Sequence, residues 1–215
     1  MSTSFTALLL TIGSAYLTGA IPFGLLLARL KGVDIRTVGS GNIGATNVFR
    51  SVGRSWGILT LLLDLLKGLC GVVLLPPLAL WLLGGGTASA ELQLCGGVAA
   101  VVGHTWPIYA GFRGGKGVAT SAGMLLGLAP WAVLLALLLW LVTLALSRYV
   151  SLASIVAAVV MGVAVWFVPF RPAGSLLVPA ALSLLALLVV VRHRSNIMRL
   201  LSGTEARFSR RGKRG

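Results

Sequence analysis

The longest uncharged stretch of the chain runs from Gly117 to Ser147 and contains 31 residues. A helix crosses the roughly 30 Å apolar core of a bilayer with about 20 residues. The stretch is therefore too long for one ordinary crossing, and Pro130 lies in its middle. Proline interrupts a helix because it lacks the backbone N–H. We expect two membrane helices that turn near Pro130, the first of them (117–129) short, tilted or packed against protein.

Other apolar stretches repeat the pattern along the chain. Because 57% of residues are hydrophobic and only 10% are charged, the chain lacks the polar surface that a soluble domain needs. We expect an all-α integral membrane protein, with one membrane domain at 1–201 and a basic tail at 202–215. The remaining expected spans are Phe5–Ala28, Ser55–Leu83, Leu92–Phe112, Tyr149–Phe170 and Pro172–Val191.

Basic residues orient these spans, because loops on the cytoplasmic side carry more Lys and Arg. The loop from Lys31 to Arg54 and the C-terminal tail are both basic. Both are cytoplasmic only if the chain turns at Pro130, which leaves Arg171 as the basic residue outside. The expected bundle has about seven helices, its N-terminus outside and its C-terminus cytoplasmic. The tail carries Arg207, Arg210, Arg211, Lys213 and Arg214.

The net charge of +14 indicates an anionic partner. Nucleic acid is not expected, since no basic and aromatic recognition module is present. Anionic lipid or an anionic substrate remains. Cys70 and Cys95 lie in apolar runs without metal-ligand spacing, and we expect neither a metal nor another cofactor.

The first polar segment, Gly39–Arg50, lies between two expected spans. Glycines let backbone N–H groups approach a ligand, and an arginine fork matches phosphate oxygens. This density of polar groups favours an anion site over a tight connecting loop anchored by Arg50. The candidate ligands are Gly39, Ser40, Gly41, Asn42, Gly44, Thr46, Asn47 and Arg50.

The second polar segment, Gly111–Gly117, places small residues around Lys116, ahead of an expected helix. A helix N-terminus presents N–H groups and partial positive charge to an anion. Val118 follows Gly117, so the segment is not a Walker loop and a nucleotide hydrolase is not favoured. The alternative is a basic loop at the membrane interface. The candidate ligands are Gly114, Gly115, Lys116 and Gly117.

The third polar segment begins at Arg192 and contains His193, Asn196 and Glu205. His193 and Asn196 share a face if the helix continues, and His193 is either a general base or an interfacial hydrogen-bonding group. Within the spans, Asp64 and Lys67 are spaced to pair on one helical face. His104 either lines the site or serves packing.

Together, the segment GSGNIGATNVFR, the Asp64–Lys67–Gly68 element, GFRGGKGVAT and RHRSN resemble the bacterial acyl-phosphate:glycerol-3-phosphate acyltransferase family (PlsY) over nearly the whole chain. The resemblance implies transfer of a fatty acyl group from acyl-phosphate to the 1-hydroxyl of glycerol-3-phosphate, an early step of phospholipid synthesis. It implies a multi-pass protein of the bacterial inner membrane, surrounded by lipid, with a cytoplasmic active site. A monomer is expected.

The resemblance also implies residue roles. The catalytic residues would be Ser40, Arg50, Lys116, His193 and Asn196. The glycines and neutral polar residues of the first two segments, together with His104, would bind the substrates, and Glu205, Asp64 and Lys67 would support the site. Two other classes remain open: an anion transporter lined by Asp64 and Lys67, and a membrane scaffold with a basic lipid-binding face.

Overall fold

The computed structural model describes residues 3–167 and 176–208, and every regular element in those ranges is a helix. The chain forms two compact units, residues 1–128 and 129–215. The expected boundary between a membrane domain and a tail at residue 201 stays a prediction. The basic tail residues Arg210, Arg211, Lys213 and Arg214 lie outside the described residues, as does Arg171.

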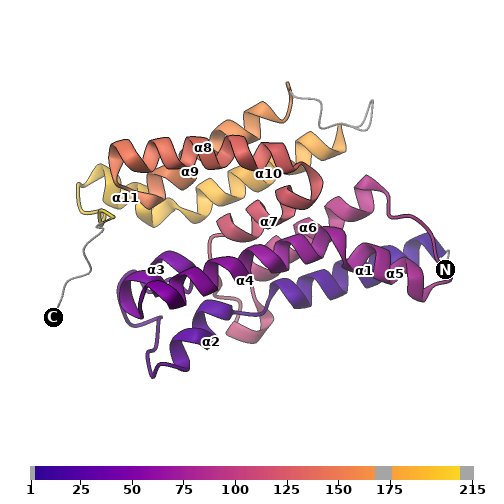
Figure 1. The fold of residues 1–215 in the computed structure, drawn as a ribbon, viewed down its shortest axis with the longest axis horizontal. Coiled ribbons are helices and arrows are strands. Elements are labelled where there is room, and N and C mark those ends of the chain that lie inside the picture. Colours follow the sequence, from indigo (N-terminus) through magenta and orange to yellow (C-terminus); the bar gives the residue numbers. More distant parts are fainter. Residues whose placement is uncertain (1–2, 168–175, 209–215) are drawn as a thin grey trace. The chain divides into compact units, whose positions relative to one another are not determined.

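The first unit is a bundle in which α4 packs against both α6 and α7, while α1 packs against α6 (Figure 1). Two short helices, α2 and α3, lie at one end of the bundle and follow the break in the first span. The elements are α1 (Thr3–Gly19), α2 (Phe23–Arg29), α3 (Ala45–Ser51), α4 (Arg54–Val73), α5 (Leu75–Leu82), α6 (Ala90–Thr105), the 3-10 turn η1 (Ile108–Ala110) and α7 (Val118–Leu128).

Prolines divide four of the expected apolar stretches. Pro22 separates α1 from α2, Pro76 lies in the first turn of α5, and Pro107 follows the end of α6. Pro130 begins α8, so the expected break in the 31-residue stretch is present. Proline removes a donor and disfavours helical geometry in the residue before it. Three stretches that we expected to be continuous are consequently broken.

Glycines let the helices of the first unit approach closely. A Cβ atom at Gly96 of α6 would overlap the carbonyl oxygen of Gly71 on α4, and one at Gly68 would overlap the carbonyl oxygen of Thr120 on α7. Small residues at crossings are the usual means of helix association in a bilayer, where apolar burial supplies little preference for protein over lipid. Helix α4 is thereby fixed between α6 and α7.

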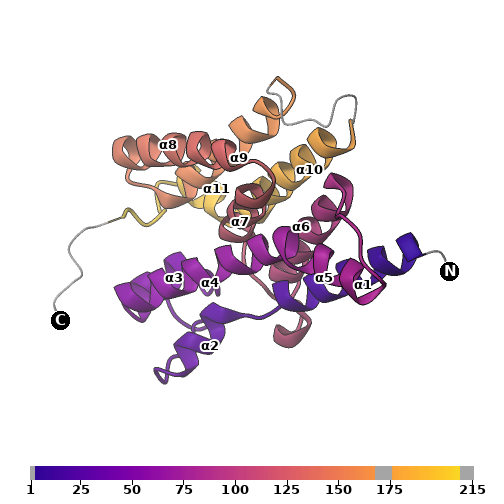
Figure 2. The same cartoon turned by 45° about the vertical axis from the view of Figure 1, so that its right-hand side comes forward.

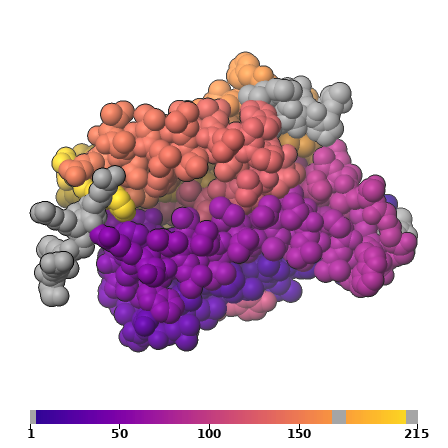
Figure 3. Space-filling model, viewed as in Figure 1, coloured from indigo at the N-terminus to yellow at the C-terminus, as the bar shows by residue number. Residues whose placement is uncertain are grey.

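The second unit contains α8 (Pro130–Ser147), α9 (Val150–Ala164), α10 (Leu177–Arg192) and α11 (Arg194–Leu201). Helix α9 packs against both α8 and α10 (Figure 2). Helix α8 is prominent in the space-filling view (Figure 3). It exposes large apolar side chains. They include Leu134, Leu138, Leu141 and Leu146. Such a surface suits lipid rather than water.

Three segments in the described ranges are long and apolar enough to cross a membrane: Ser4–Arg29, Arg54–Val73 and Pro130–Ser147. A fourth is the pair Leu177–Arg192 and Arg194–Leu201, if this pair, bent by 54°, counts as one span. Val118–Leu128 and Val150–Ala164 are shorter apolar helices. Each of the seven expected spans therefore contains a helix, while the count of seven crossings and the orientation of the termini stay predictions.

Candidate active site

Asn47 organises the first polar segment. Its side chain is buried and its Nδ2 donates to the carbonyl oxygens of Ile35, Val38 and Asn42 at 3.2, 3.0 and 3.0 Å. Its Oδ1 accepts from the backbone N–H of Ser40 at 3.1 Å. These bonds satisfy backbone groups of an irregular segment that no helix or sheet ladder pairs. The amide of Asn47 therefore holds the loop in shape.

The groups that this loop presents outward are different ones. The side chains of Ser40, Thr46 and Arg50 are exposed, and Arg50 lies in α3. Gly39 and Gly41 have φ values of 59° and 68°, which glycine adopts without strain. Asn42 accepts from the N–H of Gly44 at 2.9 Å. The segment thus combines a rigid buried frame with an exposed hydroxyl and an exposed guanidinium.

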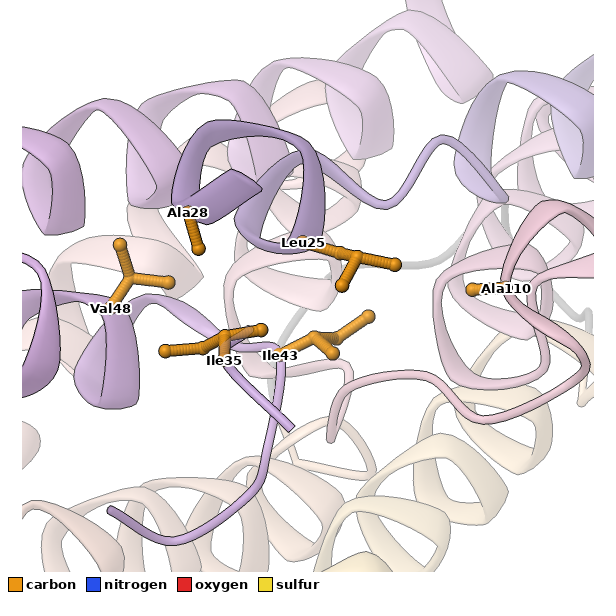
Figure 4. Close-up of a cluster of buried hydrophobic side chains, with 6 residues drawn as sticks. All are labelled: Leu25, Ala28, Ile35, Ile43, Val48 and Ala110. Atoms are coloured by element: carbon orange, nitrogen blue, oxygen red, sulfur yellow. The ribbon is translucent and has the colours of Figure 1, made fainter. Parts of the chain in front are cut away.

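A hydrophobic cluster joins the first segment to the second (Figure 4). Ile35, Ile43 and Val48 of the first segment and its approach pack with Leu25 of α2 and with Ala110, just before the second segment. The guanidinium of Arg36 also donates to the carbonyl oxygen of Ala110 at 2.7 Å. Two stretches joined by a contact across 74 residues of sequence are therefore fixed side by side in the first unit.

The second segment wraps closely around the end of α6. Gly114 and Gly115 are buried, and the N–H of Gly115 donates to the carbonyl oxygen of His104 at 3.1 Å. Lys116 is half-buried, and Gly117, with φ of 85°, leads directly into α7. The first N–H groups of a helix have no partner within the helix. Lys116 and this helix start together form an electropositive end.

The expected pairing inside the membrane is formed. Lys67 Nζ lies 2.8 Å from Asp64 Oδ1, and both side chains are buried in α4. The Nδ1 atom of His104 lies 3.4 Å from the same carboxylate oxygen, and its ring is buried as well. His104 contacts the loop at Gly115 rather than presenting an open face. Its expected role in binding substrate stays a prediction.

His193 lies at the junction of α10 and α11 and is 2% exposed. Its Nδ1 is 2.7 Å from the carbonyl oxygen of Val189. A carbonyl oxygen only accepts, so Nδ1 carries the hydrogen and the neutral ring keeps its lone pair on Nε2. The expected catalytic role of His193 stays a prediction.

Glu205 connects the third segment to its surroundings through side-chain hydrogen bonds. Its carboxylate accepts from Ser151 Oγ at 2.6 Å, from Asn196 Nδ2 at 2.7 Å and from Arg199 Nε at 2.7 Å. Burial alone would raise the pKa of Glu205, but these donors outweigh it and hold the pKa below its usual value. The contacts are those that the expected supporting role requires, although the role itself stays a prediction.

Ser151 is a contact that the sequence did not reveal. It lies in α9, 54 residues before Glu205, within no polar segment. The first two polar segments meet in the first unit, whereas the third belongs to the second unit. The meeting of all three at one reaction centre stays a prediction.

Comparison with known proteins identifies a family. A family model described as glycerol-3-phosphate acyltransferase matches residues 9–203. A glycerol-3-phosphate acyltransferase of Trichlorobacter lovleyi is 50% identical over 203 residues, covering 94% of this chain and 98% of the relative. One of Geobacter sulfurreducens is 51% identical over 194 residues, covering 90% of this chain and 94% of the relative.

Two crystal structures of PlsY (YgiH), an integral membrane glycerol 3-phosphate acyltransferase, have a similar fold. The glycerol 3-phosphate form gives a TM-score of 0.81 at 40% identity, covering 94% of this chain and 96% of that chain. The lysophosphatidic acid form gives 0.80 at 38% identity, covering 94% and 95%. These likenesses confirm the expected all-α integral membrane fold. The chain belongs to the glycerol-3-phosphate acyltransferase family.

Proposed function

We propose that this glycerol-3-phosphate acyltransferase uses acyl-phosphate as donor and acylates the 1-hydroxyl of glycerol-3-phosphate. Lysophosphatidic acid and inorganic phosphate are the products, at an early step of phospholipid synthesis. The observation that carries the proposal is the joining of two glycine-rich segments, each with a cation, through one hydrophobic cluster. Related crystal structures are described as glycerol 3-phosphate and lysophosphatidic acid forms, which supports the same acceptor and product here.

The first segment binds the phosphate of glycerol-3-phosphate. The exposed guanidinium of Arg50 offers two parallel N–H donors, and Ser40 offers a hydroxyl. Because Asn47 fixes the backbone between them, little ordering cost remains when the ligand arrives. Gly39, Gly41, Asn42, Gly44 and Thr46 complete the surface of this site.

The second segment binds the phosphate of the donor. Lys116 supplies a full positive charge, and the first N–H groups of α7, which begins after Gly117, are available to the phosphate oxygens. Gly114 and Gly115 hold this loop against His104. The apolar helices hold the acyl chain, whose burial is worth about 0.8 kcal/mol per methylene. A donor held at both ends in this way keeps its carbonyl carbon beside the membrane surface.

The reaction needs no enzyme-bound intermediate, because acyl-phosphate is already an activated mixed anhydride. The 1-hydroxyl oxygen attacks the carbonyl carbon, a tetrahedral oxyanion forms, and the bond from that carbon to the phosphate oxygen breaks. Phosphate leaves with the bonding electron pair. Two bound anions are brought together and the oxyanion is stabilised by Lys116 and backbone N–H groups, as positioning and electrostatic catalysis require.

The proton of the attacking hydroxyl has two acceptors within this proposal: a substrate phosphate and Nε2 of His193. The hydrogen bond from His193 Nδ1 to the carbonyl oxygen of Val189 favours the His193 ring over a substrate phosphate as the proton acceptor, since it leaves Nε2 as the basic atom. Asn196 and Glu205 then keep the third segment in place. We place all three segments on the cytoplasmic face of the inner membrane in a monomer surrounded by lipid.

The test uses the purified protein in detergent with palmitoyl-phosphate, glycerol-3-phosphate and a metal chelator. We expect lysophosphatidic acid and phosphate in equal amounts, and absence of both would refute the donor assignment. Reconstituted vesicles separate acyl transfer from transport, because phosphate-ester flux without acyl product would favour the transporter. Accessibility labelling of single cysteines at the second and third segments should find both on the cytoplasmic side.

A further inference from the structure

A buried three-residue network lies below the two joined loops. Asp64 and Lys67 are each 3% exposed and His104 is 6% exposed. One oxygen of Asp64 lies 2.8 Å from Lys67 Nζ and 3.4 Å from His104 Nδ1. Burying a carboxylate is costly unless charge and hydrogen bonds compensate it. All three side chains are buried, whereas Ser40 and Arg50 are exposed. We therefore look for a role of the buried carboxylate other than contact with substrate.

Through His104, the network reaches the second segment. The carbonyl oxygen of His104 accepts the N–H of Gly115 at 3.1 Å. The ring of His104 fills the place that a Cβ at Gly115 would need, and the backbone of His104 does the same at Gly114. Both glycines therefore pack directly against His104, at positions where a larger residue would clash with it. Its Nδ1 lies 3.4 Å from the Asp64 carboxylate, and the attraction between them favours the orientation of the ring against which the loop rests.

Through Lys67, the network reaches the break between α1 and α2. Lys67 Nζ donates to the carbonyl oxygen of Ile21 at 2.9 Å. Ile21 precedes Pro22 at this break, and its carbonyl oxygen also accepts the backbone N–H of Phe23 at 3.1 Å. Helix α2 then places Gly24 directly against the carbonyl group of Ile43 in the first segment. The carboxylate of Asp64 therefore lies between the supports of both segments.

We propose that Asp64, Lys67 and His104 act as one positioning network, in which the Asp64 carboxylate orients His104 and thereby fixes the Gly114–Gly117 loop for phosphate binding. His104 is on this basis a positioning residue that acts through Gly115. The inference rests on the proposed function for the identity of the ligand, but the order of the loop is measurable without any turnover.

The decisive comparison is between Asp64→Asn and the double variant Asp64→Asn with Lys67→Met. The single variant leaves a buried ammonium without its carboxylate and should lower the melting temperature. The double variant removes both charges, and such neutral replacements commonly recover much of the stability, although the carbonyl oxygen of Ile21 loses one donor. A pair that serves only to neutralise charge would then recover function as well. A positioning network would not, since His104 still lacks its carboxylate.

Two readouts are measured on each protein: the KM for palmitoyl-phosphate, and hydrogen exchange of the peptide containing Gly114–Gly117. We expect the double variant to melt closer to the parent than the single variant does, but to show a KM raised by about tenfold, the order of loss when a carboxylate that supports a metal-ligating histidine is removed. Exchange across 114–117 should be faster. Glu91→Gln, a carboxylate-to-amide change at the far end of α6, is the matched control and should alter neither readout.

Parent-like KM and parent-like exchange in the recovered double variant would overturn the proposal. If neither charge variant folds, His104→Phe gives the same test, because a phenyl ring fills the space at Gly115 without a polar contact to Asp64. Unchanged exchange and KM in that variant would also overturn the proposal. Should the parent form no lysophosphatidic acid, the proposed function fails, while the exchange comparison still decides the network.

Discussion

The most direct test of the first segment is Asn47→Asp. The substitution keeps the shape of the side chain but replaces the Nδ2 donor with a carboxylate oxygen. Three carbonyl oxygens, those of Ile35, Val38 and Asn42, then lose their donor and face a negative charge. Because Nδ2 carries two hydrogens that the three carbonyl oxygens share, at about 1 kcal/mol for each lost N–H donor the free energy of unfolding should fall by about 2 kcal/mol. Asn47 is only 4% exposed, so water cannot replace the lost hydrogen bonds.

For a chain of this length, that loss corresponds to a fall in melting temperature of about 4–8 °C. The assay heats detergent-solubilised protein with a thiol-reactive fluorophore, which reports the unfolding of partly buried Cys70 and Cys95. The control is Thr37→Ala in the same loop, which removes one exposed hydroxyl bonded to the carbonyl oxygen of Asp34. It should melt within about 2 °C of the parent, since an exposed hydrogen bond contributes little.

Kinetics then separate a loop-forming role from a ligand-binding one. Loss of loop shape should lower kcat/KM for glycerol-3-phosphate in Asn47→Asp together with the melting temperature. If the melting temperature stayed at the parent value while the KM alone rose, Asn47 would be a direct ligand and our reasoning on its buried amide would be wrong.

Three further predictions concern the groups that meet substrate or hold the third segment. Ser40→Ala and Lys116→Ala should each lower kcat by about 100-fold or more at an unchanged melting temperature, as for a lost oxyanion donor, and near-normal turnover would reject these roles. Arg50→Lys should raise the KM for glycerol-3-phosphate, because a point charge replaces a fork; an unchanged KM would argue against Arg50 as its ligand. Glu205→Gln should destabilise the protein near pH 7. Because the pKa of Glu205 is lowered on folding, its contribution is present above the unfolded value of about 4.3 and is lost as pH falls through the folded value. Melting temperatures of parent and variant should therefore converge as pH falls through the folded pKa, and a gap that stays constant as pH falls would contradict the assignment.

The sequence predicted the helices well but their continuity poorly. Apolar stretches of sufficient length identify membrane helices because lipid imposes one length scale. Of the prolines, only Pro130 was expected to divide a stretch, because its stretch was too long for one span. Pro22 and Pro107 lie in stretches of ordinary length, where a helix that kinks and a helix that ends have the same composition.

The loops themselves were predictable, while most of their supports were not. Glycines and a cation between two spans mark an anion-binding segment by local chemistry alone. Arg36 and Ala110 are 74 residues apart, and Ser151 and Glu205 are 54 apart. Such pairings depend on how the helices pack, and nothing in the local pattern around Ser151 indicates a carboxylate partner. Asp64 and Lys67 were the exception, since their i, i+3 spacing on one helix is visible in sequence.

Burial also divides the expected site residues of the first unit into two kinds. Asn47 and His104 were grouped with the substrate ligands, yet both are buried, and the polar contacts described above serve the loops. Ser40 and Arg50 are exposed on the surface that those contacts shape. A loop that must present backbone N–H groups to an anion cannot also pair them in a helix, so its form must come from side chains beneath it. A dense polar segment between membrane spans therefore contains both residues that bind substrate and residues that hold the loop in shape. Only the packing of the folded protein distinguishes the two kinds.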